Sequence, residues 1–100
     1  MTETWQHDRL LVDGELVPAS DGGTYETIDP SSGKVLGLAA DATVADARRA
    51  VAAARRAFDT TTWATDVGLR TRCLRQLHQT LADHQEALRE LVVAEVGSPV

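Results

Sequence analysis

The stretch TYETIDPSSGKVLGLAADATVADARRAVAAARRAF, residues 24–58, decides the fold of this chain. Tyr25 and Thr27 alternate with Glu26 and Ile28, which predicts a short strand with one wetter face. A turn follows, because Pro30 presets φ and Gly33 can take the left-handed conformation. Residues 35–40 then return as a second strand. The stretch therefore predicts a β-hairpin that leads into a helix.

The helix has a start signal at Thr43. Asp46 lies three residues later, as in a capping box with Asp in place of the preferred Glu. Four arginines lie off the apolar stripe of this helix, and we interpret them as a solvated face rather than a phosphate site. The stripe itself has helical spacing, is expected to face inward, and consists of Val44, Ala47, Val51, Ala54 and Phe58.

A second hairpin is predicted before this stretch. Arg9–Val12 and Glu15–Val17 flank Asp13-Gly14, a pair that favours a tight hairpin turn because both positions accept positive φ. Residues 1–8 are polar apart from one Trp, and we expect them to form a flexible tail.

A second helical layer is predicted after the stretch. Its apolar stripe consists of Leu74, Leu77, Leu81, Leu88, Leu91 and Val92. Residues 83–85 are polar and predict a bend, while Gly97 and Pro99 are a stop signal. The fold class of the isolated chain is therefore α+β, with two short β-hairpins followed by two or three helices.

Composition excludes several classes of protein. The net charge is −5 without a separate basic stripe, which argues against nucleic-acid and anionic-membrane partners. No stretch approaches the length of a membrane span, and a single cysteine fits a reducing compartment, so we expect a cytoplasmic protein. Only 4% of the residues are aromatic and many apolar ones are Ala, so the core would be thin and would need a neighbouring surface.

No complete catalytic or cofactor-binding site is visible in the residues. Gly33-Lys34 is not a phosphate loop, because Ile28 stands where the first Gly is needed and Val35 where Ser or Thr is needed. The Gly-x-Gly-x-x-Gly fingerprint is absent as well. Cys73 is interpreted as a small, half-buried hydrophobe, and the three histidines lack metal-ligand spacing. We assign no catalytic residue and no cofactor-binding residue.

The order of these signals over residues 9–100 resembles the N-terminal segment of the NAD(P)-dependent aldehyde dehydrogenase superfamily. The matching positions are Val12 to Val17, Thr27 to Leu36, Asp46, Ala50 to Ala54, Ala57-Phe58, Trp63, Arg70, Leu74 and Glu95 to Pro99. Two positions depart from the usual pattern, because Asp29 replaces Asn before the Pro and Ser98 replaces Lys. Neither position takes part in the chemistry.

The resemblance implies that residues 9–100 are the incomplete N-terminal part of a nucleotide-binding domain in the α/β aldehyde dehydrogenase fold. In that family a cysteine thiolate attacks the aldehyde, hydride passes to NAD or NADP, and a glutamate-activated water releases the acid. Those groups lie beyond residue 100, so we expect this chain alone to be inactive and to bind neither cofactor. The implied partner is the remainder of an aldehyde dehydrogenase or a full-length relative, and a homo-oligomer is expected only for the full-length family.

The resemblance also implies a monovalent-cation site. Many family members bind sodium or potassium through backbone carbonyls of the strand before the turn, with an acidic side chain from the later helix. The matching positions here are Thr27, Ile28 and Glu95, where Glu replaces the more usual Asp.

Two further hypotheses belong to other classes of protein. The chain could act as a non-catalytic interaction module that docks on a full-length relative or on another protein, because a thin core and unpaired strand edges favour docking. A helical nucleic-acid binder ranks last because the chain is acidic.

Overall fold

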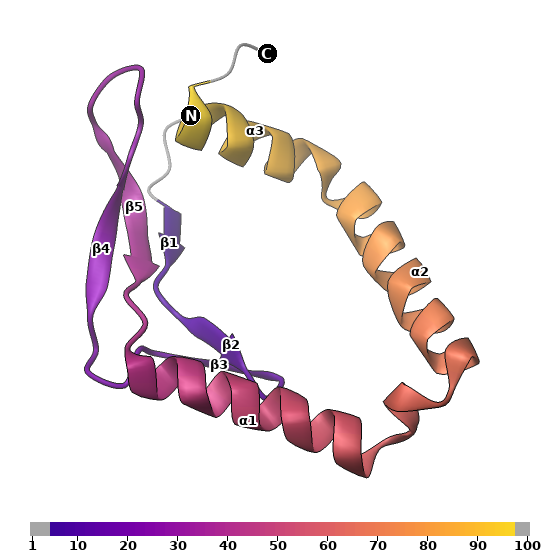
Figure 1. Cartoon of the computed structure of the whole chain (residues 1–100). Coiled ribbons are helices and arrows are strands. Elements are labelled where there is room, and N and C mark those ends of the chain that lie inside the picture. Colours follow the sequence, from indigo (N-terminus) through magenta and orange to yellow (C-terminus); the bar gives the residue numbers. More distant parts are fainter. Residues whose placement is uncertain (1–4, 98–100) are drawn as a thin grey trace.

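Five short strands and three α-helices make up the chain in the computed structural model, which describes residues 5–97 (Figure 1). The strands are β1 (Trp5–His7), β2 (Leu10–Val12), β3 (Glu15–Val17), β4 (Thr24–Ile28) and β5 (Val35–Ala40). The helices are α1 (Val44–Thr60), the 3-10 turn η1 (Thr62–Ala64), α2 (Val67–Asp83) and α3 (Gln85–Val96).

Both predicted hairpins are confirmed. Strands β2 and β3 pair antiparallel, and Asp13 and Gly14 between them have φ values of 55° and 77°, as a two-residue turn of this kind requires. Strands β4 and β5 also pair antiparallel, with an irregular register between Thr27 and Ile28. The α+β class predicted for the isolated chain is therefore correct.

The prediction of a flexible tail over residues 1–8 is wrong for part of that range. Residues Trp5–His7 form β1, which pairs in parallel with Gly37–Ala39 of β5, so the sheet order is β1-β5-β4. Parallel pairing uses backbone groups and a distant partner strand, so no local side-chain pattern announces it. Residues 1–4 lie outside the described residues.

The helix ends follow the predicted signals. The Thr43 side chain accepts a hydrogen bond from the Asp46 N–H at 3.2 Å, and the Asp46 carboxylate accepts one from the Thr43 N–H at 2.9 Å, so the capping box is confirmed. The predicted bend is the junction at His84, where α2 ends and α3 begins. Gly97 ends α3 with φ of 69°. Pro99, the other part of the stop signal, lies outside the described residues.

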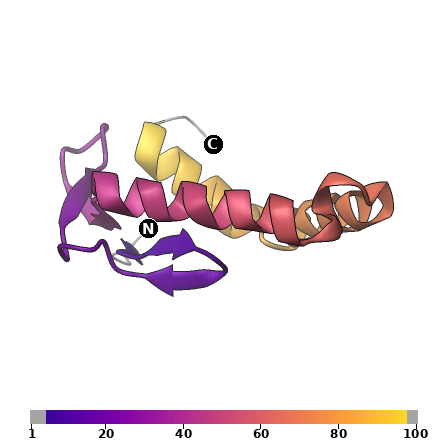
Figure 2. The same cartoon turned by 60° about the horizontal axis from the view of Figure 1, so that its bottom comes forward.

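The elements form a flat, open frame whose sides are the β4–β5 hairpin, α1 with the β2–β3 hairpin, and α2 with α3 (Figures 1 and 2). The chain measures 48 × 34 × 17 Å. Its radius of gyration is 16.8 Å, whereas a compact chain of this length has about 13 Å. The frame therefore lacks the shape of a self-contained globular domain.

Burial is correspondingly slight. Ala19 and Ala53 are the buried apolar residues in the part of the chain that the structure describes. The accessible surface is 7701 Å², against about 5,500 Å² for a compact monomer of 10.8 kDa. Apolar side chains of all three helices therefore remain in contact with water.

The expected inner face of α1 is not covered within this chain. Val44 and Val51 of the predicted stripe are 70% and 69% exposed. The residues that α1 buries are Asp46 and Ala53, on the side that packs along the β2–β3 hairpin (Figure 2). Helical spacing identified the apolar side of α1, but the hairpin packs against a different side.

Across residues 5–97 we find no helix with the length and apolar character needed to cross a membrane.

Candidate functional site

One pocket lies between α3 and the turn that joins β4 to β5. Its volume is 540 Å³, and its lining consists of Asp29, Ser31, Leu36, Glu86, Arg89, Glu90, Val93 and Ala94. Arg89 donates to both carboxylate oxygens of Glu86, at 2.8 and 2.9 Å. The pocket thus contains three carboxyl groups and one guanidinium that is already paired.

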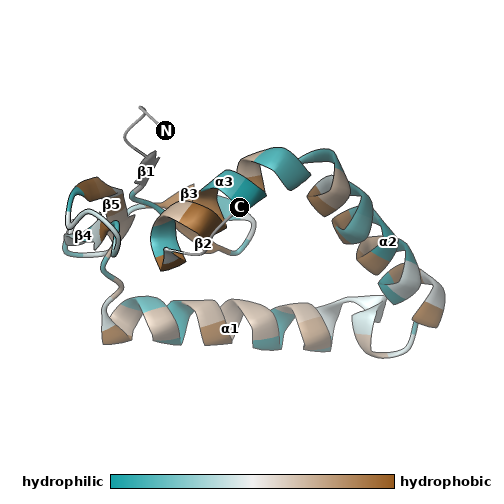
Figure 3. Ribbon diagram, turned by 90° about the horizontal axis from the view of Figure 1, so that it is seen from above, coloured by the Kyte–Doolittle hydropathy of each residue, from teal (hydrophilic) through white to brown (hydrophobic). Residues whose placement is uncertain are grey.

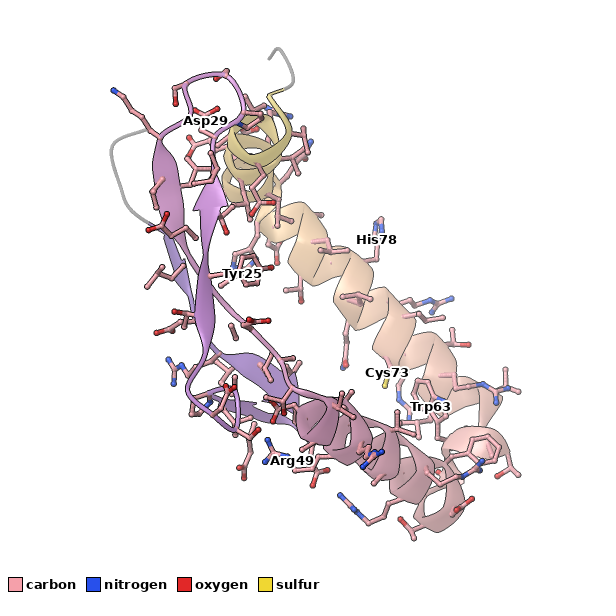
Figure 4. The ribbon with its side chains drawn as sticks, turned by 60° about the vertical axis from the view of Figure 1, so that its left-hand side comes forward. Tyr25, Asp29, Arg49, Trp63, Cys73 and His78 are labelled. Carbon is pink, nitrogen blue, oxygen red and sulfur yellow. The ribbon has the colours of Figure 1, made fainter. Side chains whose placement is uncertain are left out.

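The turn at the edge of this pocket is built on Asp29. Asp29 lies in the turn at the end of the hairpin (Figure 4). One of its carboxylate oxygens accepts hydrogen bonds from the Ser31 hydroxyl at 2.7 Å and from the Ser31 N–H at 2.8 Å. The Asp29 carbonyl accepts from the Gly33 N–H at 2.8 Å. The Ser31 hydroxyl, followed by the Ser31 N–H, holds the pKa of Asp29 below its ordinary value. The Ser31 hydroxyl donates to a carboxylate within the same turn, so this pair is structural and not an activated nucleophile.

A second carboxylate, Asp46, joins two distant segments. It is 1% exposed and accepts hydrogen bonds from the Thr43 N–H at 2.9 Å and from the Ser20 N–H at 3.1 Å. The guanidinium of Arg49 also donates to it. The Thr43 and Ser20 N–H groups hold the pKa of Asp46 well below its usual range, against the opposing effect of burial. Every contact of this carboxylate is structural, and it fastens the loop after β3 to the start of α1.

The residues predicted to hold a monovalent cation lie near one corner of the frame. Thr27 is half-buried, and Ile28 and Glu95 are exposed. The end of α3 approaches the turn after β4, because a Cβ added at Gly97 would lie 3.2 Å from Pro30 Cγ. Glu95 projects into solvent within the part of the chain that the structure describes. No cluster of three His, Cys, Asp or Glu side chains suited to a metal occurs between residues 5 and 97, and the cation site stays a prediction.

The cysteine and the histidines of the helical layer agree with their structural interpretation. Cys73 is half-buried and points toward the inside of the frame, whereas His78 projects from the opposite side of α2 (Figure 4). His84 lies at the junction of α2 and α3, with Nδ1 2.8 Å from the Thr80 carbonyl oxygen. Neither histidine is placed as a base for Cys73.

Two contacts were missed at the sequence level. One is the bond from the Ser20 N–H to Asp46, which no residue pattern announces. The other is the guanidinium of Arg70, whose Nη1 donates to the carbonyls of Trp63 and Ala64 at 3.1 Å. An arginine in the first turn of α2, shortly after the connector, was the available signal for this contact.

The sequence model of the aldehyde dehydrogenase family matches residues 16–100, which is most of the chain. The chain belongs to the aldehyde dehydrogenase family. Its resemblance to the N-terminal segment of that family is therefore confirmed.

Known relatives agree with this assignment. Aldehyde dehydrogenase family 2 member B4, mitochondrial, of Arabidopsis thaliana is 35% identical over 94 residues, which cover 93% of this chain and 18% of the relative. The NAD-dependent aldehyde dehydrogenase of Sinorhizobium meliloti superimposes with a TM-score of 0.89 at 35% identity, covering 97% of this chain and 20% of that one. An aldehyde dehydrogenase of Mycobacterium tuberculosis, solved in complex with NAD+, gives 0.88 at 31% identity, with 97% and 20% covered.

This chain thus spans about a fifth of the length of the aldehyde dehydrogenases it matches. The pocket beside α3 does not fit the dinucleotide of that family. It presents Asp29, Glu86 and Glu90, which would repel a pyrophosphate, and its one guanidinium is paired with Glu86. We derive no catalytic step through a nicotinamide cofactor from these residues.

Proposed function

We propose that this chain is the N-terminal segment of an NAD(P)-dependent aldehyde dehydrogenase that oxidises an aldehyde to a carboxylic acid. The observation that supports this most directly is the superposition on the Sinorhizobium meliloti enzyme, which covers 97% of this chain and 20% of that enzyme. In this proposal, residues 9–100 contribute to a nucleotide-binding domain, and NAD or NADP binds to residues outside them.

We also propose that the 100-residue chain alone does not catalyse the reaction. Oxidation through a thiohemiacetal needs an accessible thiolate and a base for the attacking water. Cys73 is half-buried, and His78 projects from the opposite side of α2. The segment therefore contributes structure, and the reacting groups belong to the rest of the enzyme.

Two proteins test this function. The first is the 100-residue chain, and the second is a chimera in which the chain replaces the matched segment of the Sinorhizobium meliloti enzyme. With an aldehyde that the parent enzyme oxidises, we expect the chimera to form NADH and the chain alone to form none. Activity of the chain alone, or a folded chimera without activity, would contradict the proposal.

The second candidate function is a non-catalytic interaction module, favoured by the apolar side chains exposed on all three helices. If the chain is such a module, a full-length relative or another protein should copurify with it from cells. A monomer that unfolds cooperatively and copurifies with no other protein would count against it.

For the whole enzyme we propose a cytoplasmic location, supported by the single cysteine of this chain. We also propose that the whole enzyme is a homo-oligomer, supported by family membership.

We also propose a sodium or potassium ion bound by the backbone carbonyls of Thr27 and Ile28 and by the Glu95 carboxylate. Its support is the approach of the end of α3 to the turn after β4. In the chimera, NaCl or KCl should raise the melting temperature above that in choline chloride at equal ionic strength. Glu95→Gln should remove the difference, whereas Glu90→Gln, on the same helix, should keep it. Equal melting temperatures in all three salts would exclude the site.

A further inference from the structure

The turn of the β2–β3 hairpin consists of an aspartate followed by a glycine, Asp13 and Gly14. In such a pair the glycine nitrogen can attack Cγ of the aspartate and close a five-membered succinimide ring. Glycine favours the attack because it lacks a Cβ that would obstruct the approach. The same pair recurs at Asp21-Gly22, so the two turns share their reacting residues and differ in their surroundings.

The reaction at such a pair is an isomerisation that consumes no oxidant or reductant. The bond from the glycine nitrogen to Cγ forms, and the carboxyl hydroxyl leaves as water with the proton of that N–H. Water then opens the ring. Its addition at Cγ restores aspartate. Its addition at the former backbone carbonyl breaks the original peptide bond and leaves isoaspartate, in which the backbone runs through the side-chain carbon.

Both reacting groups of Asp13-Gly14 are open to water. The Asp13 side chain is 65% exposed. The Gly14 N–H donates to no backbone carbonyl among residues 5–97, and the space that a Cβ of Gly14 would occupy is empty to 4 Å. Asp13 also has φ of 55°, a left-handed conformation that raises the free energy of a residue with a side chain. The turn is therefore both accessible and strained.

One contact restrains the Asp13 carboxylate. Its Oδ2 accepts a hydrogen bond from Nη2 of Arg56 at 2.8 Å, and both side chains are more than half exposed. Apolar and polar residues succeed one another along α1 in Figure 3, and Arg56 is one of the polar ones. Ion pairs on an exposed surface contribute little. The carboxylate must leave Arg56 to reach the Gly14 nitrogen, so this pair slows the reaction without preventing it.

The groups of Asp21-Gly22 are held in the folded chain. Oδ1 of Asp21 accepts a hydrogen bond from the Gly23 N–H at 2.8 Å. The Gly22 N–H donates to the carbonyl of Ala19, also at 2.8 Å, and Ala19 is buried. Cyclisation at this pair has to break both hydrogen bonds. We propose that Asp13-Gly14 is the site at which the folded chain converts spontaneously to isoaspartate, and that Asp21-Gly22 is protected.

The modification changes the hairpin and its contact with α1. Isoaspartate adds one carbon to the backbone of a two-residue turn, whose geometry fixes the register of Val12 opposite Glu15. It also attaches the carboxylate directly to Cα, which draws the group back from Arg56. Hydrogen exchange in β2 and β3 should therefore be faster in the isomerised chain. Because the reaction uses only this turn, it is independent of the proposed function.

The test compares the two pairs within one chain. The 100-residue chain is incubated at neutral pH, in buffer and in urea that unfolds it. It is then digested with endoproteinase Asp-N, which cuts before aspartate but not before isoaspartate, and the peptides are measured by mass spectrometry. In buffer, cleavage before residue 13 should be lost about tenfold faster than cleavage before residue 21, because two ordinary hydrogen bonds protect the second pair. In urea the two losses should proceed at similar rates.

A matched pair of variants tests the restraint. Arg56→Gln should speed the loss before residue 13 in buffer, by up to about fivefold, because an exposed ion pair restrains no more than that. Arg55→Gln removes a guanidinium that pairs with Asp59 on the same helix, and should leave the rate unchanged. Equal rates for these two variants would overturn the role of Arg56. Equal losses at the two pairs in buffer, or a faster loss before residue 21, would overturn the proposal.

Discussion

At the scale of single residues, Asp46 has the most consequential environment. Its carboxylate accepts hydrogen bonds from Thr43, Ser20 and Arg49, although it is almost fully buried. A carboxylate held by N–H groups and a guanidinium keeps its charge at low pH, because each of those donors favours the ionised form. The stability of the junction between the β3 loop and α1 should therefore depend on that charge.

Replacing Asp46 by Asn tests this dependence. The folded-state pKa of Asp46 is depressed, so its contribution to stability is fully present above the ordinary pKa of about 4 and is lost as the pH falls further. Asp46→Asn should lower the urea midpoint at pH 7 and reduce its fall between pH 4 and pH 2. Circular dichroism during urea titration measures both.

Asp59→Asn is the matched control. Asp59 pairs with Arg55 at 2.8 Å on the surface of the same helix, where ion pairs contribute little. It should change the midpoint at pH 7 only slightly and leave the acid dependence as in the parent. An Asp46→Asn variant with the full acid dependence of the parent would show that other carboxylates cause it.

At the scale of elements, the end of α3 makes a second testable junction. Gly97 has φ of 69°, and an added Cβ would lie 3.2 Å from Pro30 Cγ. Gly97→Ala should destabilise the chain by about 1 kcal/mol through the backbone alone, and further through the contact with Pro30. Hydrogen exchange should then quicken at the last turn of α3.

Gly14→Ala separates the two causes. Gly14 also has positive φ, at 77°, but nothing lies within 4 Å of an added Cβ. Its substitution should therefore show the backbone cost only. Equal losses for the two variants would mean that Pro30 yields to the new methyl group.

The elements also show what sequence reasoning can reach. Asp13-Gly14 and the Thr43–Asp46 box act within a few residues, so turn and capping chemistry predicted both correctly. Two other contacts join positions that are distant in the sequence: the pairing of β1 with β5, and the hydrogen bond from the Ser20 N–H to Asp46. Both use backbone groups, which every residue type except proline provides, so the sequence does not predict them. The spacing of apolar residues on α1 correctly identified the apolar side of the helix. It did not predict that the β2–β3 hairpin packs against a different side of α1.

At the scale of the whole molecule, the open frame has a measurable size. A monomer that keeps the frame should give a small-angle X-ray scattering radius near the 16.8 Å of the Cα atoms, slightly larger because of side chains and hydration. A chain that collapses onto its own exposed apolar side chains should approach about 13 Å. The second result would show that the arrangement of the three sides needs the rest of the enzyme to persist.

The parallel pairing of β1 with β5 has a consequence for synthesis on the ribosome. Trp5–His7 is translated before its partner residues Gly37–Ala39. At ordinary translation rates the delay is on the order of seconds, while a hairpin such as β2–β3 closes in about 1–10 μs. Strand β5 pairs with β4 as well, through a short local turn. Strand β1 is thus translated before its partner strand, and a nascent chain carries it without that partner throughout the interval.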